Sequence, residues 1–207
     1  MKQVVCFGDS NTWGLIPGIK ERYSWGERWT SILQEKLNVD KVRVIEEGLC
    51  GRTTVFEDAY RANRNGLKSI PFILESQKPI DAVILMLGTN DCKSAYQPNA
   101  YKIGRGIEQC IDALLDEISP EKILLISPIW LGEEVWKPEF DPEFDKNSVE
   151  VSKQLKNTYR KIASAKGIHF GAASDYVKPS PKDQEHLDVD SHGILADAVY
   201  SKLKEII

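Results

Sequence analysis

The stretch VVCFGDSNTWG, residues 4–14, begins as a short apolar run and changes abruptly to small and polar residues. Its β-branched and aromatic side chains are typical of a buried strand. Gly8 permits a sharp turn after that strand, so Ser10 would stand at the start of the next element, beside backbone N–H groups without partners. Ligands bind at this edge of an open α/β sheet, so the stretch predicts a serine in a binding site. Taken alone, the same polar residues could equally cap a helix or form a turn.

Four further strand-like runs follow, and helical patterns separate them. The runs cover residues 41–45, 81–87, 122–126 and 167–170. Apolar residues recur at helical spacing in five segments, which are 25–37, 66–76, 103–118, 149–165 and 191–207. Strands that alternate with helices in this way form a parallel sheet covered on both faces. We therefore expect an α/β fold, a three-layer α/β/α sandwich with a five-stranded parallel sheet.

Length and composition favour one domain over residues 1–207. The chain is 42% hydrophobic, which is enough for one substantial core. Its 27 basic and 31 acidic residues give a formal net charge of −4, and no basic run is dense enough to predict nucleic acid as a partner. No stretch approaches the length of a membrane span, and the first apolar run is too short for a signal peptide. We therefore expect a cytoplasmic protein.

The cysteines show no pattern of a metal site or a disulfide framework. Cys6, Cys50, Cys92 and Cys110 lack the close pairing that metal ligands have. Without an export signal, reduced thiols are the expected state. The cysteines therefore predict no metal site, and the serine chemistry considered below needs no metal or organic cofactor.

Two other predicted strands lead into loops that carry hydrogen-bond donors. The second strand is followed by a loop with Gly51, and the third by Gly88-Thr89-Asn90-Asp91. Together with the backbone N–H of Ser10, the backbone N–H of Gly51 and the side-chain amide of Asn90 could stabilise a negative oxygen in a reaction. Read singly, Gly51 is more often a plain turn glycine and Asn90 a turn or capping residue.

A serine becomes a nucleophile when a histidine takes its proton and a carboxylate orients that histidine. Among the three histidines, His169 lies in a strand-like run, where a core or sheet-edge role is the simpler reading, and His192 could be a first-turn residue of the last helix. His186 follows Asp183 by three positions, in a loop before that helix. That spacing in a tight turn can bring Asp183 to one ring nitrogen and leave the other facing the serine, although the motif alone arises often by chance. If His186 is the base, activity should rise near the ordinary histidine pKa of about 6.5.

These blocks together resemble the GDSL, or SGNH, family of serine esterases and lipases. That family uses a serine, a glycine, an asparagine and a histidine in four successive blocks, and Ser10, Gly51, Asn90 and His186 stand in that order. The resemblance implies a flavodoxin-like sheet with strand order 2-1-3-4-5. It also implies catalysis by Ser10, Asp183 and His186, with an oxyanion hole formed by Ser10, Gly51 and Asn90.

Residues 44–49, 52–54 and 86–91 look like the arylesterase and acyltransferase branch of the family, whose members act on short acyl esters. One departure is Gln184, because relatives commonly have glycine after the aspartate. This departure leaves the turn around the predicted acid open, with Asp188 and Asp190 as the alternative partners.

We expect a serine esterase that hydrolyses, and could also transfer, the short acyl groups of a small ester. A carbohydrate O-deacetylase of the same family and a catalytically silent α/β binding module are the alternatives. Residues 129–147 are rich in aromatic side chains without a clear period. They could wall a narrow acyl pocket, which predicts substrate binding by Trp13 and Trp130, or be covered by a second copy in a homo-oligomer. The third reading is that they fold back onto their own core.

Overall fold

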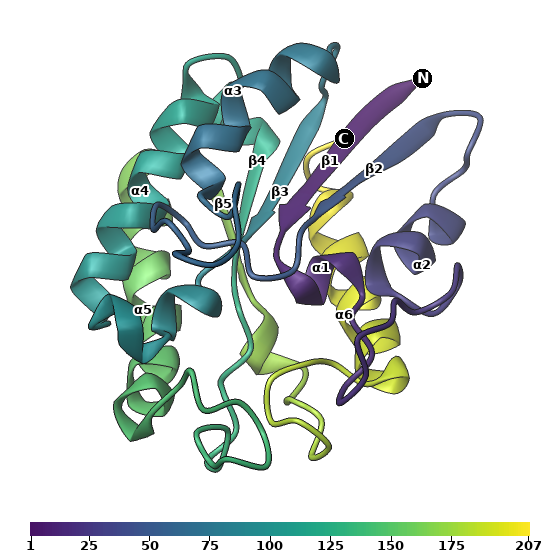
Figure 1. The fold of residues 1–207 in the computed structure, drawn as a ribbon. Helices are drawn as coiled ribbons and strands as arrows, with labels where there is room; N and C mark the ends of the chain where they lie inside the picture. Colours follow the sequence, from purple (N-terminus) through teal and green to yellow (C-terminus); the bar gives the residue numbers. More distant parts are fainter.

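Five parallel strands form the middle layer of the structure, a computed structural model that describes residues 1–207 (Figure 1). The strands are β1 (Lys2–Gly8), β2 (Val42–Gly48), β3 (Ala82–Met86), β4 (Ile123–Ser127) and β5 (His169–Ala172). They lie in the order β2-β1-β3-β4-β5, and every neighbouring pair is parallel. The predicted α/β fold class and strand order are confirmed.

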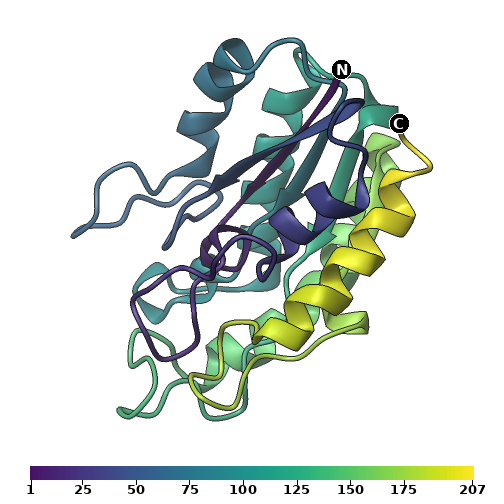
Figure 2. The ribbon, with the colours of Figure 1, turned by 90° about the vertical axis from the view of Figure 1, so that its right-hand side faces the viewer.

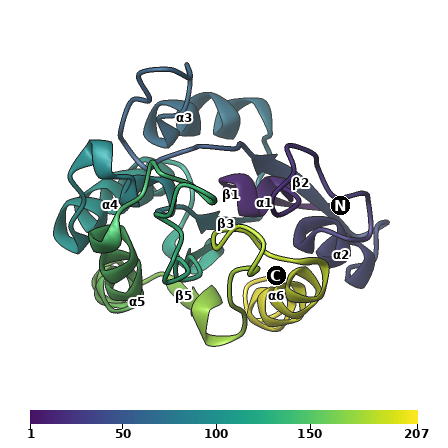
Figure 3. The same ribbon diagram turned by 60° about the horizontal axis from the view of Figure 1, so that its bottom comes forward.

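Helices cover both faces of this sheet, as Figures 2 and 3 show. They are α1 (Ser10–Trp13), α2 (Trp29–Lys36), α3 (Gly66–Ser76), α4 (Ala100–Leu115), α5 (Lys146–Lys166) and α6 (Val189–Leu203). One core cluster joins one face of the sheet to α3, α4 and α5, and a second joins the other face to α2 and α6. Successive strand residues alternate between the two clusters, because side chains of a strand point to opposite faces. No helix is both apolar enough and long enough to cross a membrane.

The carboxyl ends of the central strands meet at one level. Gly8, the last residue of β1, pairs with Gly48 of β2 and with Met86 of β3. The chain reverses its direction of winding at β1, since β2 lies on one side of it and β3 on the other. The loops that follow these three strands therefore open into one crevice, which is where ligands bind in such folds.

Helix α2 begins later than the apolar spacing predicts. The pattern from residue 25 suggests an earlier start, but Trp25 is 56% exposed and precedes the helix. Arg28, at the N-cap, makes no side-chain capping bond, and the Trp29 N–H instead donates to Nδ1 of His192 at 3.2 Å. A tertiary contact with α6 thus satisfies a donor at the start of this helix, which local sequence could not reveal.

The aromatic segment of residues 129–147 mostly folds back onto its own core. Val135 and Phe144 are buried in the cluster beneath α4 and α5, and Trp136 packs against that cluster. Trp130 is the exception, because 40% of it is exposed. Because the other large side chains of this segment are packed against their own domain, most of its apolar surface needs no acyl pocket or second copy to shield it from water.

Substitution of Gly48 by alanine tests the close approach of α1 to the strand ends. A Cβ at Gly48 would lie 2.2 Å from the Trp13 nitrogen and 2.6 Å from its Cα, so the backbone of α1 would have to move. We expect a loss of about 1–3 kcal/mol in the free energy of unfolding, measured by urea denaturation. Gly193→Ala is the control, since nothing lies within 4 Å of its Cβ and alanine favours a helix by about 0.5–1 kcal/mol. Equal midpoints for the two variants would contradict this account.

Candidate active site

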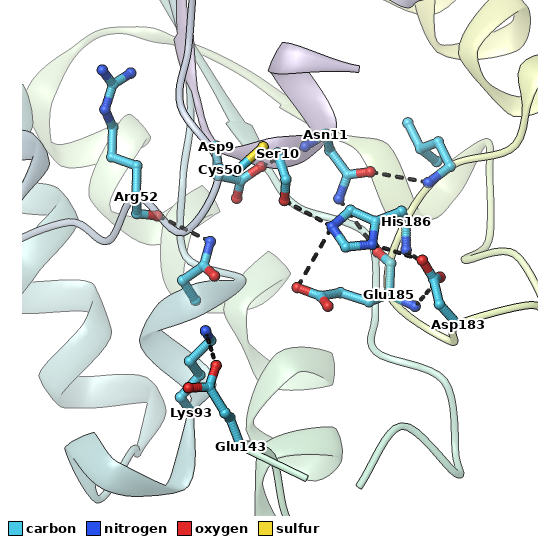
Figure 4. A network of polar contacts seen from close by, with 12 residues as sticks. Asp9, Ser10, Asn11, Cys50, Arg52, Lys93, Glu143, Asp183, Glu185 and His186 are labelled. Carbon is cyan, nitrogen blue, oxygen red and sulfur yellow. Dashed lines mark hydrogen bonds and ion pairs between the residues drawn. The ribbon is translucent and has the colours of Figure 1, made fainter. Parts of the chain in front are cut away.

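Ser10, His186 and Asp183 form one continuous chain of hydrogen bonds (Figure 4). Ser10 is the first residue of α1, directly after the turn that ends β1. Nε2 of His186 lies 2.9 Å from Ser10 Oγ, and Nδ1 lies 2.8 Å from Asp183 Oδ2. The structure thus brings the predicted serine, base and acid together, and this geometry suits proton transfer from the serine.

Backbone bonds hold the acid and base in their turn. Asp183 Oδ1 accepts from the N–H groups of Glu185 and His186 at 3.1 and 3.0 Å, and Oδ2 also accepts from the Gly18 N–H. Asn11 joins this turn to α1, because its side-chain oxygen accepts from Leu187 N–H and its amide donates to the Glu185 carbonyl. Sequence reasoning missed this role of Asn11, although its position beside Ser10 in an edge loop was a signal.

Gln184, the departure noted in the sequence, adopts a left-handed backbone conformation. Its φ is +65°, in the left-handed region that costs a side-chain-bearing residue about 1–2 kcal/mol. The Gln184 N–H donates to the Ser180 carbonyl, and its own carbonyl accepts from the Gly132 N–H at 2.7 Å. These two bonds hold the strained residue, so Asp183 keeps its place beside the imidazole, and the alternative partners Asp188 and Asp190 do not contact that ring.

Two further ties position the loops after β2 and β3. The Asp91 carboxylate accepts from the N–H of Thr54 at 3.0 Å and from its hydroxyl. Asn90 donates through its side-chain amide to the Arg52 carbonyl at 3.1 Å, and the Arg52 guanidinium donates to the Gly8 carbonyl at 2.9 Å. The carboxyl ends of three strands are therefore held together. Arg52 and Asp91 were not predicted as positioning residues, though both flank predicted site residues.

Each of the three predicted oxyanion donors has an N–H group free to bind a ligand. Gly51 has φ +83° in a turn closed by the Arg52 N–H on the Leu49 carbonyl, and its own N–H has no acceptor in the protein. Ser10 opens α1, so its N–H has no intrahelical partner. Asn90 uses its amide on one carbonyl and retains a second N–H.

Burial and charge act on the triad in opposite directions. Burial alone lowers the pKa of His186, but the negative charge of Glu185 and the hydrogen bond to Asp183 outweigh it and raise the pKa to about 9. For Asp183, burial favours a higher pKa, yet hydrogen bonds from His186 prevail and lower it. The pair therefore favours imidazolium beside carboxylate, the charge state that follows proton transfer from the serine.

Residues 6–194 match the GDSL-like lipase/acylhydrolase family. The chain belongs to this family. A carbohydrate acetylesterase from Sinorhizobium meliloti shares 32% identity with it, with a TM-score of 0.89 and 100% of each chain covered. The aryl esterase of M. smegmatis shares 28% identity, also with a TM-score of 0.89 and full coverage of both chains. A lipase/acylhydrolase from Enterococcus faecalis shares the fold at 20% identity, with a TM-score of 0.70 over 99% of this chain and 96% of that one. No curated protein matches the sequence.

The other histidines of this GDSL-like protein lie outside the hydrogen-bond chain. His192 is fully buried and accepts the Trp29 N–H through Nδ1, and burial lowers its pKa to about 4. His169 lies in β5, at the edge of the sheet. The structure thus gives His192 a packing role, in keeping with its prediction as a first-turn residue.

The two predicted substrate-binding tryptophans lie in different segments of the chain. Trp13 ends α1, and the Arg22 guanidinium lies over its ring, 5.4 Å from the centroid. Trp130 lines a cavity of about 320 Å³ together with Ser174 and Lys178, and none of the triad residues lines that cavity. Substrate binding by either tryptophan stays a prediction.

Titration of the three histidines by NMR tests the electrostatics of the site. We expect the His186 ring to titrate above the ordinary value of about 6.5, toward 9, and His192 to titrate below it, toward 4. Asp183→Asn should lower the pKa of His186, because it removes one of the three negative charges, those of Glu185, Asp183 and Asp9, that favour the imidazolium. Identical titration of His186 and His192 would refute this assignment of environments.

Proposed function

We propose that this protein is a serine esterase that hydrolyses short acyl esters through an acyl intermediate on Ser10. The observation that carries the proposal is the hydrogen-bond chain from Ser10 through His186 to Asp183 at the carboxyl edge of the sheet. Membership of the GDSL-like lipase/acylhydrolase family and the likeness to an aryl esterase and a carbohydrate acetylesterase support it. The chain is accordingly a carboxylic ester hydrolase.

In the first step, Ser10 Oγ attacks the ester carbonyl while its proton passes to His186 Nε2. Asp183 stabilises the imidazolium that forms and keeps Nδ1 protonated. The carbonyl oxygen becomes negative, and the N–H groups of Ser10, Gly51 and Asn90 are the donors proposed to bind it. Preorganised donors of this kind often supply the largest single part of the rate enhancement.

Collapse of the tetrahedral intermediate breaks the bond to the alcohol, which leaves with the proton from Nε2. Water then attacks the acyl-serine, gives its proton to Nε2, and the carboxylic acid departs as Ser10 regains its proton. An alcohol in place of water would produce a new ester, which is the acyl transfer predicted from the sequence. Because only neutral His186 accepts the serine proton, activity should rise with pH, and the raised pKa moves this rise above the value of about 6.5 expected from sequence.

A carbohydrate O-deacetylase is the second candidate. The similarity to a carbohydrate acetylesterase at 32% identity favours it. The chemistry is the same, so the candidates differ only in the alcohol part of the ester. A homo-oligomer and a cytoplasmic location stay predictions from sequence, and light scattering measures the first.

Removal of the nucleophile tests the reaction. Ser10→Ala should abolish hydrolysis of aryl acetates and labelling by an organophosphonate, because both need an activated hydroxyl. Its circular dichroism should match the wild type, since the change removes a single oxygen and leaves the backbone contacts of α1 intact. His169→Ala is the control, and it should retain activity and labelling. Wild-type turnover by Ser10→Ala, or failure of the wild type to react with the probe, would overturn the proposed function.

Loss of the Asn90 amide tests the oxyanion hole. Asn90→Ala should lower kcat by about two to three orders of magnitude, with a smaller change in KM, if its amide acts mainly in the transition state. Asn99→Ala is a matched control, because Asn99 caps the distant helix α4. A change in KM alone would instead make Asn90 a ground-state binder.

A further inference from the structure

Glu185 places a carboxylate beside the reacting atoms that the triad itself does not use. Its side chain is 8% exposed, and Oε1 lies 3.8 Å from His186 Nε2, the nitrogen that faces Ser10. Figure 4 shows this carboxylate on the same side of the imidazole as the serine. No protein group donates a hydrogen bond to it. Its backbone is fixed by bonds to Asp183 and Asn11, which places the residue directly beside the base.

Apart from the His186 ring at 3.8 Å, which is beyond hydrogen-bond distance and becomes neutral as the base, the surroundings of Glu185 offer the carboxylate no dedicated cation. The charged groups near it are His186 and Asp183 in its own turn, Asp141 in the segment after β4, and Lys93 after β3. Lys93 is already paired with Glu143, and Asp141 and Asp183 repel a negative charge. Burial raises the pKa of Glu185 to about 7, against the opposing charge of His186. A buried carboxylate without a donor is costly, which points to a donor that arrives with a ligand.

The proton path fixes where the alcohol part of an ester must lie. His186 Nε2 returns its proton to the leaving oxygen, so that oxygen must come within about 3 Å of Nε2. Glu185 Oε1 lies 3.8 Å from the same nitrogen. A group two or three bonds beyond the leaving oxygen can therefore reach the carboxylate, whereas the carbonyl oxygen points to the donors near Gly51 and Asn90.

We propose that Glu185 is a specificity-determining residue that binds the alcohol part of the ester and selects alcohols with a hydroxyl or cationic group close to the ester oxygen, such as polyols. This inference rests on the proposed esterase function and names the substrate class of the same site. A hydroxyl there donates a charge-assisted hydrogen bond to the carboxylate. An alkyl or aryl alcohol leaves the carboxylate desolvated without a partner, and polar sites reject such analogues strongly.

Two matched pairs of acetate esters test the proposal. The first pair is 2-hydroxyethyl acetate and propyl acetate, which differ by a hydroxyl in place of a methyl group. The second is acetylcholine and its neutral isostere 3,3-dimethylbutyl acetate. Above neutral pH, the wild type should show kcat/KM about tenfold higher for the first ester of each pair. Glu185→Gln should lose the preference for the cation and keep part of that for the hydroxyl, whereas Glu185→Leu should lose both.

A pH profile separates this role from a purely structural one. Glu185→Gln should move the rise of kcat/KM on propyl acetate to lower pH, because it removes the charge that raises the pKa of His186. A structural defect would lower the rate without moving that midpoint. Glu139→Gln, an exposed substitution outside the site, is the matched control and should change neither the ratios nor the profile.

The outcomes distinguish the two levels of the proposal. Activity on all four esters with ratios near one in the wild type, or ratios and pH midpoint unchanged in Glu185→Gln, would overturn the role of Glu185 alone. A wild type that hydrolyses none of the four and resists the phosphonate probe would overturn the esterase function, and this inference with it.

Discussion

The hydrogen bond between Ser10 Oγ and His186 Nε2 joins residues 176 positions apart and is the contact on which the site depends. It can form only if the end of β1 and the loop before α6 meet at one edge of the sheet. Asn11 holds these two segments together through two hydrogen bonds to the loop, one to Glu185 and one to Leu187, the neighbours of His186. The first strand and the last loop are thereby built into a single unit.

Close backbone packing at the strand ends makes this arrangement possible. Helix α1 lies so near β1 and β2 that Gly8 and Gly48 have no room for a side chain. The Arg52 guanidinium fills the space behind the site, over the Phe7 ring and against the Gly8 carbonyl. The donors proposed for the oxyanion therefore rest on rigid supports, as preorganised electrostatic stabilisation requires.

Buried acids shape the electrostatics of this edge. Burial raises the pKa of Asp9 to about 6 and of Asp91 to about 7. Both carboxylates accept hydrogen bonds from backbone N–H groups, Asp9 from Asn11 at the start of α1 and Asp91 from Thr54 in the loop after β2. Glu185 is different, because its carboxylate faces the reacting atoms instead of a loop. A site lined in this way suits a polar alcohol better than an apolar one. The structural neighbours include both an aryl esterase and a carbohydrate acetylesterase, so the open question for this site is which alcohol part of the ester it accepts.

The sequence by itself determined the alternation of strands and helices and the order of the four blocks, because both depend on short-range pattern. Residue spacing made Asp183 the candidate partner of His186 but left Asp188 and Asp190 open, because the turn at Gln184 was not fixed by local pattern. Only the tertiary structure decided that α2 begins at Trp29, that Gln184 adopts a left-handed conformation, and that the Glu185 carboxylate faces Nε2. Each of these depends on contacts between segments distant in sequence, and local pattern carries no information about which loops meet at the edge of a sheet.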